Sequence, residues 1–176
     1  MIVLCGKTAS GKTLIRNMLK SKGYEPIITY TTRPPRSGEI QDVSYHFVSD
    51  EEFLRMVNDG EFAEYKQYRV ADGSVWQYGC TKDSLKNDNG VIILTPQGYK
   101  DVRDGLPADH KCIYLYANRS TIKKRLTIRG DSPDEIERRI KADNIDFKDF
   151  QYEPGVRVVY NNIGADTDEL VKNILK

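Results

Sequence analysis

Several features that define whole classes of protein are missing from this sequence of 176 residues. Its longest apolar runs, Met1 to Cys5 and Val91 to Leu94, are too short to cross a bilayer. The N-terminus lacks the basic region and long apolar segment of a signal peptide. There is no internal repeat and no low-complexity segment. We therefore expect a cytoplasmic protein with no membrane partner.

The chain also has little net charge and few cysteines. A formal charge of +1 gives no broad field for nucleic acid or an anionic membrane, so we expect neither partner, and any basic site must be local. Of the 3 cysteines, Cys5 and Cys112 lie in apolar segments, which favours reduced, buried thiols. This length supports one core with small insertions. Monomer and homodimer both remain open.

Apolar strands and amphipathic helices alternate along much of the chain. Helices are predicted after Lys12, over 120–128 and 133–147 with a junction at Gly130, and over a last segment that Asp166 caps. The pattern predicts an α/β fold with a parallel-sheet core. Its buried strands are predicted at Ile2 to Cys5, Val91 to Leu94, Cys112 to Tyr116 and Val156 to Tyr160.

Residues 30–80 depart from this alternation. Tyr-rich alternating segments predict short strands near 27–30, 45–48, 62–68 and 75–79. One helix interrupts them, and the run Ser49 to Glu52 opens it with a capping-box pattern. We therefore predict a small domain at 30–80, inserted into a core formed by 1–29 and 81–176.

A phosphate-binding loop is predicted directly after the first strand. The octet Gly6 to Thr13, GKTASGKT, fits the pattern G-x-x-x-x-G-K-[ST]. Its two glycines allow backbone N–H groups to face phosphate oxygens, and the helix beginning near Lys12 adds its N-terminal partial charge. Lys12 is predicted to bridge the β- and γ-phosphates, and the Thr13 hydroxyl to ligate Mg²⁺. A glycine-rich turn that binds nothing is the alternative.

A second anion site is predicted in the run TTRPPRSGE from Thr31 to Glu39. The Pro34-Pro35 pair limits backbone freedom between Arg33 and Arg36, so two guanidinium groups can face a dianionic phosphate at little ordering cost. Solvated charges on a Pro-rich turn are the alternative. Two anion sites in one chain indicate a transferase.

Together with the two Arg-rich helices predicted over 120–128 and 133–147, these two motifs resemble the guanylate kinase family. The resemblance covers nearly the whole chain. The resemblance implies a P-loop NTPase with a parallel-sheet core, an inserted small α/β nucleotide-monophosphate-binding domain and a helical lid at about 118–147. It implies in-line phosphoryl transfer from Mg-ATP to GMP or dGMP, giving ADP and GDP or dGDP.

The resemblance also implies the site residues. Lys12, Arg33, Arg125, Arg129 and Arg139 would be catalytic, and Thr13 would ligate Mg²⁺. ATP would contact Gly6, Ala9, Ser10, Gly11, Lys12, Thr13, Leu14 and Asn161. The acceptor nucleotide would contact Thr29, Arg33, Arg36, Glu39, Tyr45, Glu64, Tyr78, Cys80 and Thr95.

Glu64 has the chemistry to select guanine. Guanine presents N1–H and its 2-amino group as adjacent donors, and an ionised carboxylate offers only acceptors. Adenine has an acceptor at N1 and would leave the carboxylate unpaired. An exposed strand glutamate is the alternative.

Some positions depart from the family pattern. Cys80 stands where a serine is usual, and a thiol is a weaker hydrogen-bonding group. Ile93 and Thr95 stand where the family has two aspartates, one near the Mg²⁺ shell and one facing the guanine amino group. The segment Arg69 to Gln77 is longer than usual and carries Trp76, which either stacks on a base or, as we favour, packs into the small domain.

Two other functions are consistent with the sequence. The same fold could act on another nucleoside monophosphate or on a phosphorylated sugar, which the missing aspartates favour. The chain could also be a non-catalytic binding module with a guanylate kinase fold, although the intact phosphate loop argues against it.

Overall fold

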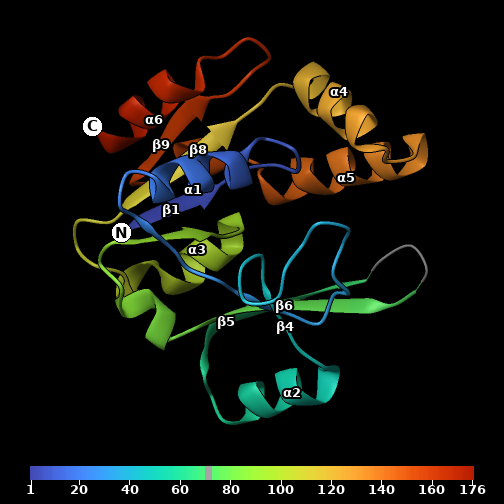
Figure 1. Ribbon diagram of the computed structural model, residues 1–176, viewed down its shortest axis with the longest axis vertical. Helices are drawn as coiled ribbons and strands as arrows, with labels where there is room; N and C mark the ends of the chain where they lie inside the picture. The colour runs from blue at the N-terminus through green and yellow to red at the C-terminus, as the bar shows by residue number, and fades with distance from the viewer. Residues whose placement is uncertain (70–72) are drawn as a thin grey trace.

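The computed structural model describes residues 1–69 and 73–176. Its larger sheet contains, in spatial order, β2 (Glu25–Pro26), β7 (Gly90–Ile93), β1 (Ile2–Cys5), β8 (Lys111–Tyr116) and β9 (Val156–Tyr160), all paired in parallel (Figure 1). The predicted parallel core is confirmed. Because β1 lies at the centre of the sheet, the loop after it opens at the middle of the carboxyl edge, where open α/β sheets bind ligands.

Helices cover both faces of this sheet because successive strand residues point to opposite sides. Ile2 and Leu4 pack in one cluster with residues of α1 (Lys12–Lys20) and α6 (Thr167–Leu175). Val3 and Cys5 pack in the other with residues of α3 (Pro96–Val102). The Asp166 side chain accepts from two backbone amides at the start of α6, which confirms the predicted cap. Short 3₁₀ turns occupy Asp83–Lys86, Arg103–Gly105 and Phe150–Tyr152.

A second sheet is built entirely from residues 30–81. It contains β4 (His46–Phe47), β3 (Tyr30–Thr31), β6 (Val75–Thr81) and β5 (Phe62–Arg69), and α2 (Asp50–Asn58) packs on it (Figure 1). Ser49 Oγ accepts from the Glu52 amide, so the predicted start of α2 is confirmed. In the long connection predicted over Arg69 to Gln77, Arg69 pairs with Val75, Tyr68 with Trp76 and Gln67 with Gln77, and residues 70–72 lie outside the described residues. The division into core and inserted domain stays a prediction.

Two local predictions differ from the structure. The strand predicted near 27–30 is wrongly placed: Glu25–Pro26 joins the large sheet, Tyr30–Thr31 joins the small one, and 27–29 link them. The apolar pattern does not predict α3, because a helix of 7 residues is too short to show a clear period. Its signals were present: Thr95 caps the helix by accepting from the Gly98 amide at 3.0 Å, and Pro96 takes the first helical position.

The Arg-rich segments form two helices, α4 (Arg119–Arg129) and α5 (Pro133–Asp146), close to the predicted ranges. They share a small apolar cluster of their own, which includes Leu126, Ile136 and Ile140. Gly130 ends α4 with φ 91, a left-handed conformation that favours glycine. In Figure 1 the pair lies to one side of the large sheet. No helix in the described ranges is both long and apolar enough to cross a membrane.

Candidate active site

The loop after β1 closes tightly on the rest of the fold. Gly11 has φ 101, and a Cβ there would lie 2.4 Å from Asn161 Nδ2. A Cβ on Gly6 would lie 2.5 Å from Ser10 Oγ and 2.7 Å from the carbonyl oxygen of Leu115. Both glycines of the predicted motif are therefore required by close approach of neighbouring atoms.

This loop presents a row of free backbone donors. Within the described chain, the amides of Ala9, Gly11, Lys12, Thr13 and Leu14 make no hydrogen bond. Lys12 Nζ donates to the carbonyl oxygens of Gly6 at 2.6 Å and Lys7 at 3.0 Å. Burial lowers the pKa of Lys12, and the nearby Asp143 carboxylate opposes that shift. Free N–H groups beside a buried ammonium form an anion site.

Other residues predicted on the ATP side also lie around the loop. Buried Asn161 donates from Nδ2 to the Ser10 carbonyl at 2.8 Å, and Arg125 bonds the Ala9 carbonyl at 3.1 Å and Asn161 Oδ1 at 3.3 Å. The Ser10 hydroxyl is buried without a hydrogen-bond partner among the described residues. Leu14 is half exposed on α1.

The donor set near the loop suits Mg²⁺ bound largely by phosphate and water. Thr13 is exposed at the start of α1. The described residues contain no group of three or more His, Cys, Asp or Glu able to form a protein cage for a metal. Mg²⁺ usually keeps several waters and takes only one or two protein ligands, so the Thr13 hydroxyl fits that role.

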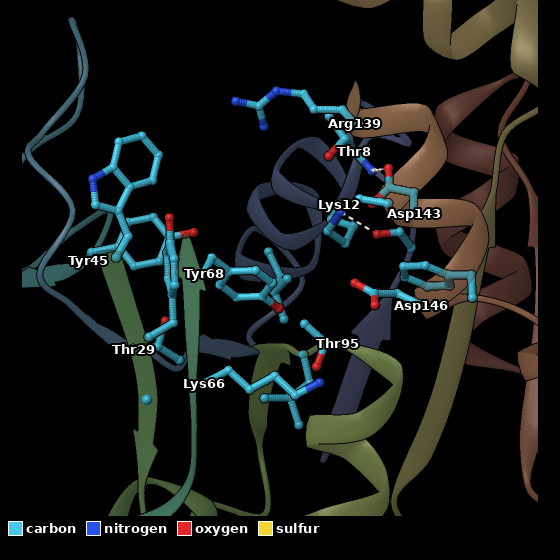
Figure 2. Close-up of a pocket in the computed structure, with 18 of the residues that line it drawn as sticks. Thr8, Lys12, Thr29, Tyr45, Lys66, Tyr68, Thr95, Arg139, Asp143 and Asp146 are labelled. Carbon is cyan, nitrogen blue, oxygen red and sulfur yellow. Dashed lines mark hydrogen bonds between the residues drawn. The ribbon is translucent and has the colours of Figure 1, made fainter. Parts of the chain in front are cut away.

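A cavity of about 330 Å³ lies between this loop, the small sheet and α5 (Figure 2). Of the predicted site residues, it is lined by Gly6, Lys12, Thr29, Arg36, Tyr45, Glu64, Tyr78, Thr95 and Arg139. Both predicted anion sites therefore border one cavity.

Arg33 and Arg36 lie together on the side of the small sheet. Arg33 is 3% exposed, and its Nη2 donates to both oxygens of Glu39 at 2.8 Å. Glu39 also accepts from the Arg36 amide at 2.8 Å, so one carboxylate orders both residues. Partial burial and the charges of Arg33, Arg139 and Arg129 lower the pKa of Arg36. Convergence of like charges on an open cavity is typical of an anion site.

Aromatic rings hold Arg33 in place. Its guanidinium carbon lies 5.4 Å from the Tyr45 ring centre and 6.0 Å from that of Trp76. Tyr45 and Tyr78 meet edge to face at 6.0 Å. Trp76, a residue of β6 in the small sheet, thus packs against Arg33 and also borders the cavity. The arginine side chain is fixed by cation–π contacts as well as by its carboxylate partner.

Glu64 also borders the cavity and lies against the first turn of α3. A Cβ on Gly98 would lie 3.1 Å from Glu64 Oε2 and 3.2 Å from Thr95 Oγ1, so both side chains lie close to Gly98. Within the described chain the Glu64 carboxylate makes no hydrogen bond. Burial raises the pKa of Glu64 to about 7, while Lys66 opposes the shift. This carboxylate is available for a ligand.

Some predicted residues do not border the cavity of the described structure. Cys80 is fully buried, its Sγ lies 3.3 Å from Ser84 Oγ, and burial raises its pKa to about 11. Arg33 is buried against the Tyr45 ring, and Arg125 donates to the carbonyl oxygen of Ala9 in the loop. Arg129 pairs with Asp131.

The sequence patterns missed other cavity residues. Alternation along β5 places Lys66 and Tyr68 on the same face as Glu64, a signal that the sequence contained. Helical spacing on α5 similarly brings Asp143 and Asp146 to the face of Arg139. Arg138 also borders the cavity.

A phosphate loop facing a second cationic site across one cavity defines a P-loop phosphotransferase. The family model for guanylate kinase matches residues 1–163, so the chain belongs to the guanylate kinase family and is an ATP-dependent nucleoside-monophosphate kinase. Guanylate kinase of Prochlorococcus marinus is 29% identical, with 100% of this chain and 95% of the relative covered. That of Fusobacterium nucleatum is 30% identical, with 92% and 88% covered.

A solved structure has the same fold. The crystal structure of guanylate kinase from Anaplasma phagocytophilum aligns with a TM-score of 0.68 at 20% identity, covering 99% of this chain and 81% of that one. At this identity the likeness concerns the fold alone.

Proposed function

We propose that this protein transfers the γ-phosphoryl group of Mg-ATP to the phosphate of GMP or dGMP. The observation that carries the choice of acceptor is Glu64: a largely buried carboxylate without a hydrogen-bond partner in the described structure, in the cavity that Arg36 also borders. Two adjacent donors of guanine would satisfy it, whereas adenine would leave it unpaired.

The acceptor phosphate would lie between Arg36, Tyr45 and Tyr78. Arg33 would support it from behind, because Glu39 and the aromatic rings fix the guanidinium. Thr29 and Thr95 border the same cavity and would contact the rest of the nucleotide. Little side-chain freedom would be lost on binding, because these contacts exist beforehand.

The ATP phosphates would occupy the free amides of the loop, with Asn161 and Arg125 alongside. Lys12 would exchange its two carbonyl partners for phosphate oxygens. Mg²⁺ would neutralise charge on the β- and γ-phosphates, held by Thr13 together with phosphate and water.

Transfer itself would need no side-chain nucleophile. An acceptor phosphate oxygen attacks the γ-phosphorus in line, the bond from that phosphorus to the β-bridging oxygen breaks, and ADP leaves. Lys12 and the arginines stabilise the charge of the transition state. We propose α4 and α5 as a lid, from which Arg139 reaches over the cavity (Figure 2), with Arg125 and Arg129 joining on closure. We place the reaction in the cytoplasm, where thiols such as the three free cysteines stay reduced.

ADP formation from Mg-ATP tests this proposal, with GMP, dGMP, AMP, CMP, UMP, dTMP and a phosphorylated ribose as acceptors beside an acceptor-free control. We expect GMP or dGMP to give the highest kcat/KM and Glu64→Gln to lose that preference. A different best acceptor, unaffected by Glu64→Gln, would contradict the guanine assignment. That result would support the alternative acceptor, another nucleoside monophosphate or a phosphorylated sugar. Thr95 is consistent with this alternative because a helix-capping threonine stands where the family has an aspartate.

A further inference from the structure

Helix α5 contacts the phosphate loop through a carboxylate. Asp143 Oδ2 accepts a hydrogen bond from the Thr8 amide at 2.7 Å, and Figure 2 shows Asp143 beside Thr8 and Lys12. Next to it, Asn144 Oδ1 accepts from Lys7 Nζ at 2.6 Å, but at the exposed surface. Burial raises the pKa of Asp143, whereas the Thr8 N–H and the Lys12 ammonium lower it. The Asp143 contact is the more shielded of the two, and it is charge-assisted.

The Thr8 amide lies next to the free amides of the phosphate loop but is itself hydrogen-bonded to Asp143. The amides of Ala9 and of residues 11–14 make no hydrogen bond in the described chain while Asp143 is bound to Thr8. The contact therefore leaves these amides free for a nucleotide phosphate. An apolar cluster, against which Ala9 of the loop also packs, joins α4 and α5 in addition to this bond.

Helical geometry transmits the contact to a proposed catalytic side chain. Arg139 precedes Asp143 by four residues, so both project from one face of α5, and both border the cavity. Glu135 Oε1 lies 2.7 Å from Arg139 Nε and steadies the stem of that side chain. Because the hydrogen bond to Thr8 holds Asp143 against the loop, it also holds the backbone of Arg139, one helical turn earlier, in position near the loop.

We propose that Asp143 is a positioning residue: its carboxylate ties α5 to the Thr8 amide and so holds Arg139 over the phosphoryl group in transit. The catalytic consequence rests on the proposed function, whereas the tie itself can be tested without it. The tie requires an acceptor oxygen at this position. Asparagine supplies one in the same place, and alanine supplies none.

Three variants of the full chain test the proposal: Asp143→Ala, Asp143→Asn and, as a control, Lys141→Ala, an exposed position on the same helix. Transfer to the best acceptor gives kcat and KM, and acceptor-free ADP formation gives wasteful hydrolysis. The Thr8 amide proton, followed by NMR for chemical shift and hydrogen exchange without nucleotide, reports the contact directly.

We expect Asp143→Ala to lower kcat about tenfold, with both KM values within twofold, because only the placement of Arg139 in the transition state is lost. Hydrolysis should rise relative to transfer, and the Thr8 amide should shift upfield and exchange faster. Asp143→Asn should restore most of kcat and of the Thr8 signal, and Lys141→Ala should match the wild type.

Several outcomes would overturn the proposal. An unchanged kcat in Asp143→Ala would show that the contact does not position the lid, and an unchanged Thr8 signal that it does not form. An equal loss of kcat in the Asn and Ala variants would show that the charge of Asp143 is essential and that an acceptor oxygen alone does not position the helix. Tighter Mg-ATP binding in both variants with unchanged kcat would identify a competitor of phosphate. Absence of wild-type transfer to GMP or dGMP would refute the proposed function, while the Thr8 signal still tests the tie.

Discussion

The two sides of the cavity are built on different principles. The ATP side is eight consecutive residues, Gly6 to Thr13, whose free backbone amides and one lysine form the anion site. The acceptor side is assembled from side chains on β5, β6 and the loops before β4 and α3, which lie far apart in the sequence. Backbone recognition suits the phosphates that all nucleoside triphosphates share, and side-chain recognition suits one acceptor. Substitutions on the ATP side should therefore lower turnover with every acceptor, whereas substitutions on the acceptor side should lower recognition of one acceptor.

The largest effect is expected on the ATP side. Lys12→Ala should lower kcat by about 10²–10³-fold or more for every acceptor, because it removes the ammonium that stabilises charge on the transferred group. The melting temperature should change little, since the Lys12 ammonium bonds only loop carbonyls. Lys7→Ala is the matched control: it removes a neighbouring charge whose partner, Asn144, is exposed, and should cost only a few-fold. Near-normal turnover in a folded Lys12→Ala protein would contradict the assigned site.

The next largest effect should depend on the acceptor. Glu64→Gln replaces one acceptor oxygen by a donor that opposes the donors of guanine, so kcat/KM for GMP should fall about 10²-fold while Mg-ATP affinity stays unchanged. Titration calorimetry with ATP and steady-state kinetics with GMP separate the two quantities. An equal loss of ATP affinity would show that the sides of the cavity are not independent.

Glu64 should also make the reaction depend on pH. With its pKa raised to about 7, the carboxylate is ionised only above that value, so kcat/KM for GMP should be about tenfold lower at pH 6 than at pH 8. The phosphate group of GMP also titrates in this pH range. The pH profile of kcat/KM for Glu64→Gln measures that contribution alone. Between 4.5 and 7 the folded protein holds a proton that the unfolded chain releases, so stability falls as pH rises. Glu64→Gln should therefore melt higher than the wild type at pH 8 and equally at pH 5.

The sequence predicts the structure of the loop after β1 because its motif is local, while the contacts of this loop with ATP stay a prediction. One motif with its strand and helix gave every residue of the loop, and the closeness of Gly11 to Asn161 explains why glycine stands there. The parallel core was predicted for a similar reason, since each buried strand is a continuous apolar run.

The acceptor side and the lid are less predictable because they depend on tertiary contacts. Cys80 was expected to meet the nucleotide, but the pleat of β6 turns its thiol toward Ser84. Asp143 was not singled out, because a carboxylate on a charged helix gives no sign that it will meet the Thr8 amide from far along the chain. The sequence predicts that Thr95 contacts the acceptor nucleotide, which stays a prediction, whereas its role as the cap of α3 follows only from the structure.

The smallest effect should come from the end of the acceptor site where Glu64 meets α3. Thr95→Asp keeps a helix-capping side chain, since aspartate caps as well as threonine, and adds an acceptor beside Glu64. The KM for GMP should fall a few-fold in steady-state kinetics at pH 8, where Glu64 is ionised, and the gain should shrink at pH 6. Cys80→Ser is the matched control, because the Cys80 thiol faces Ser84 outside the cavity of the described structure, and its KM should stay within twofold. If Cys80→Ser lowered KM and Thr95→Asp did not, the base would lie nearer β6 than α3, which would contradict the placement of the base between Glu64 and Thr95.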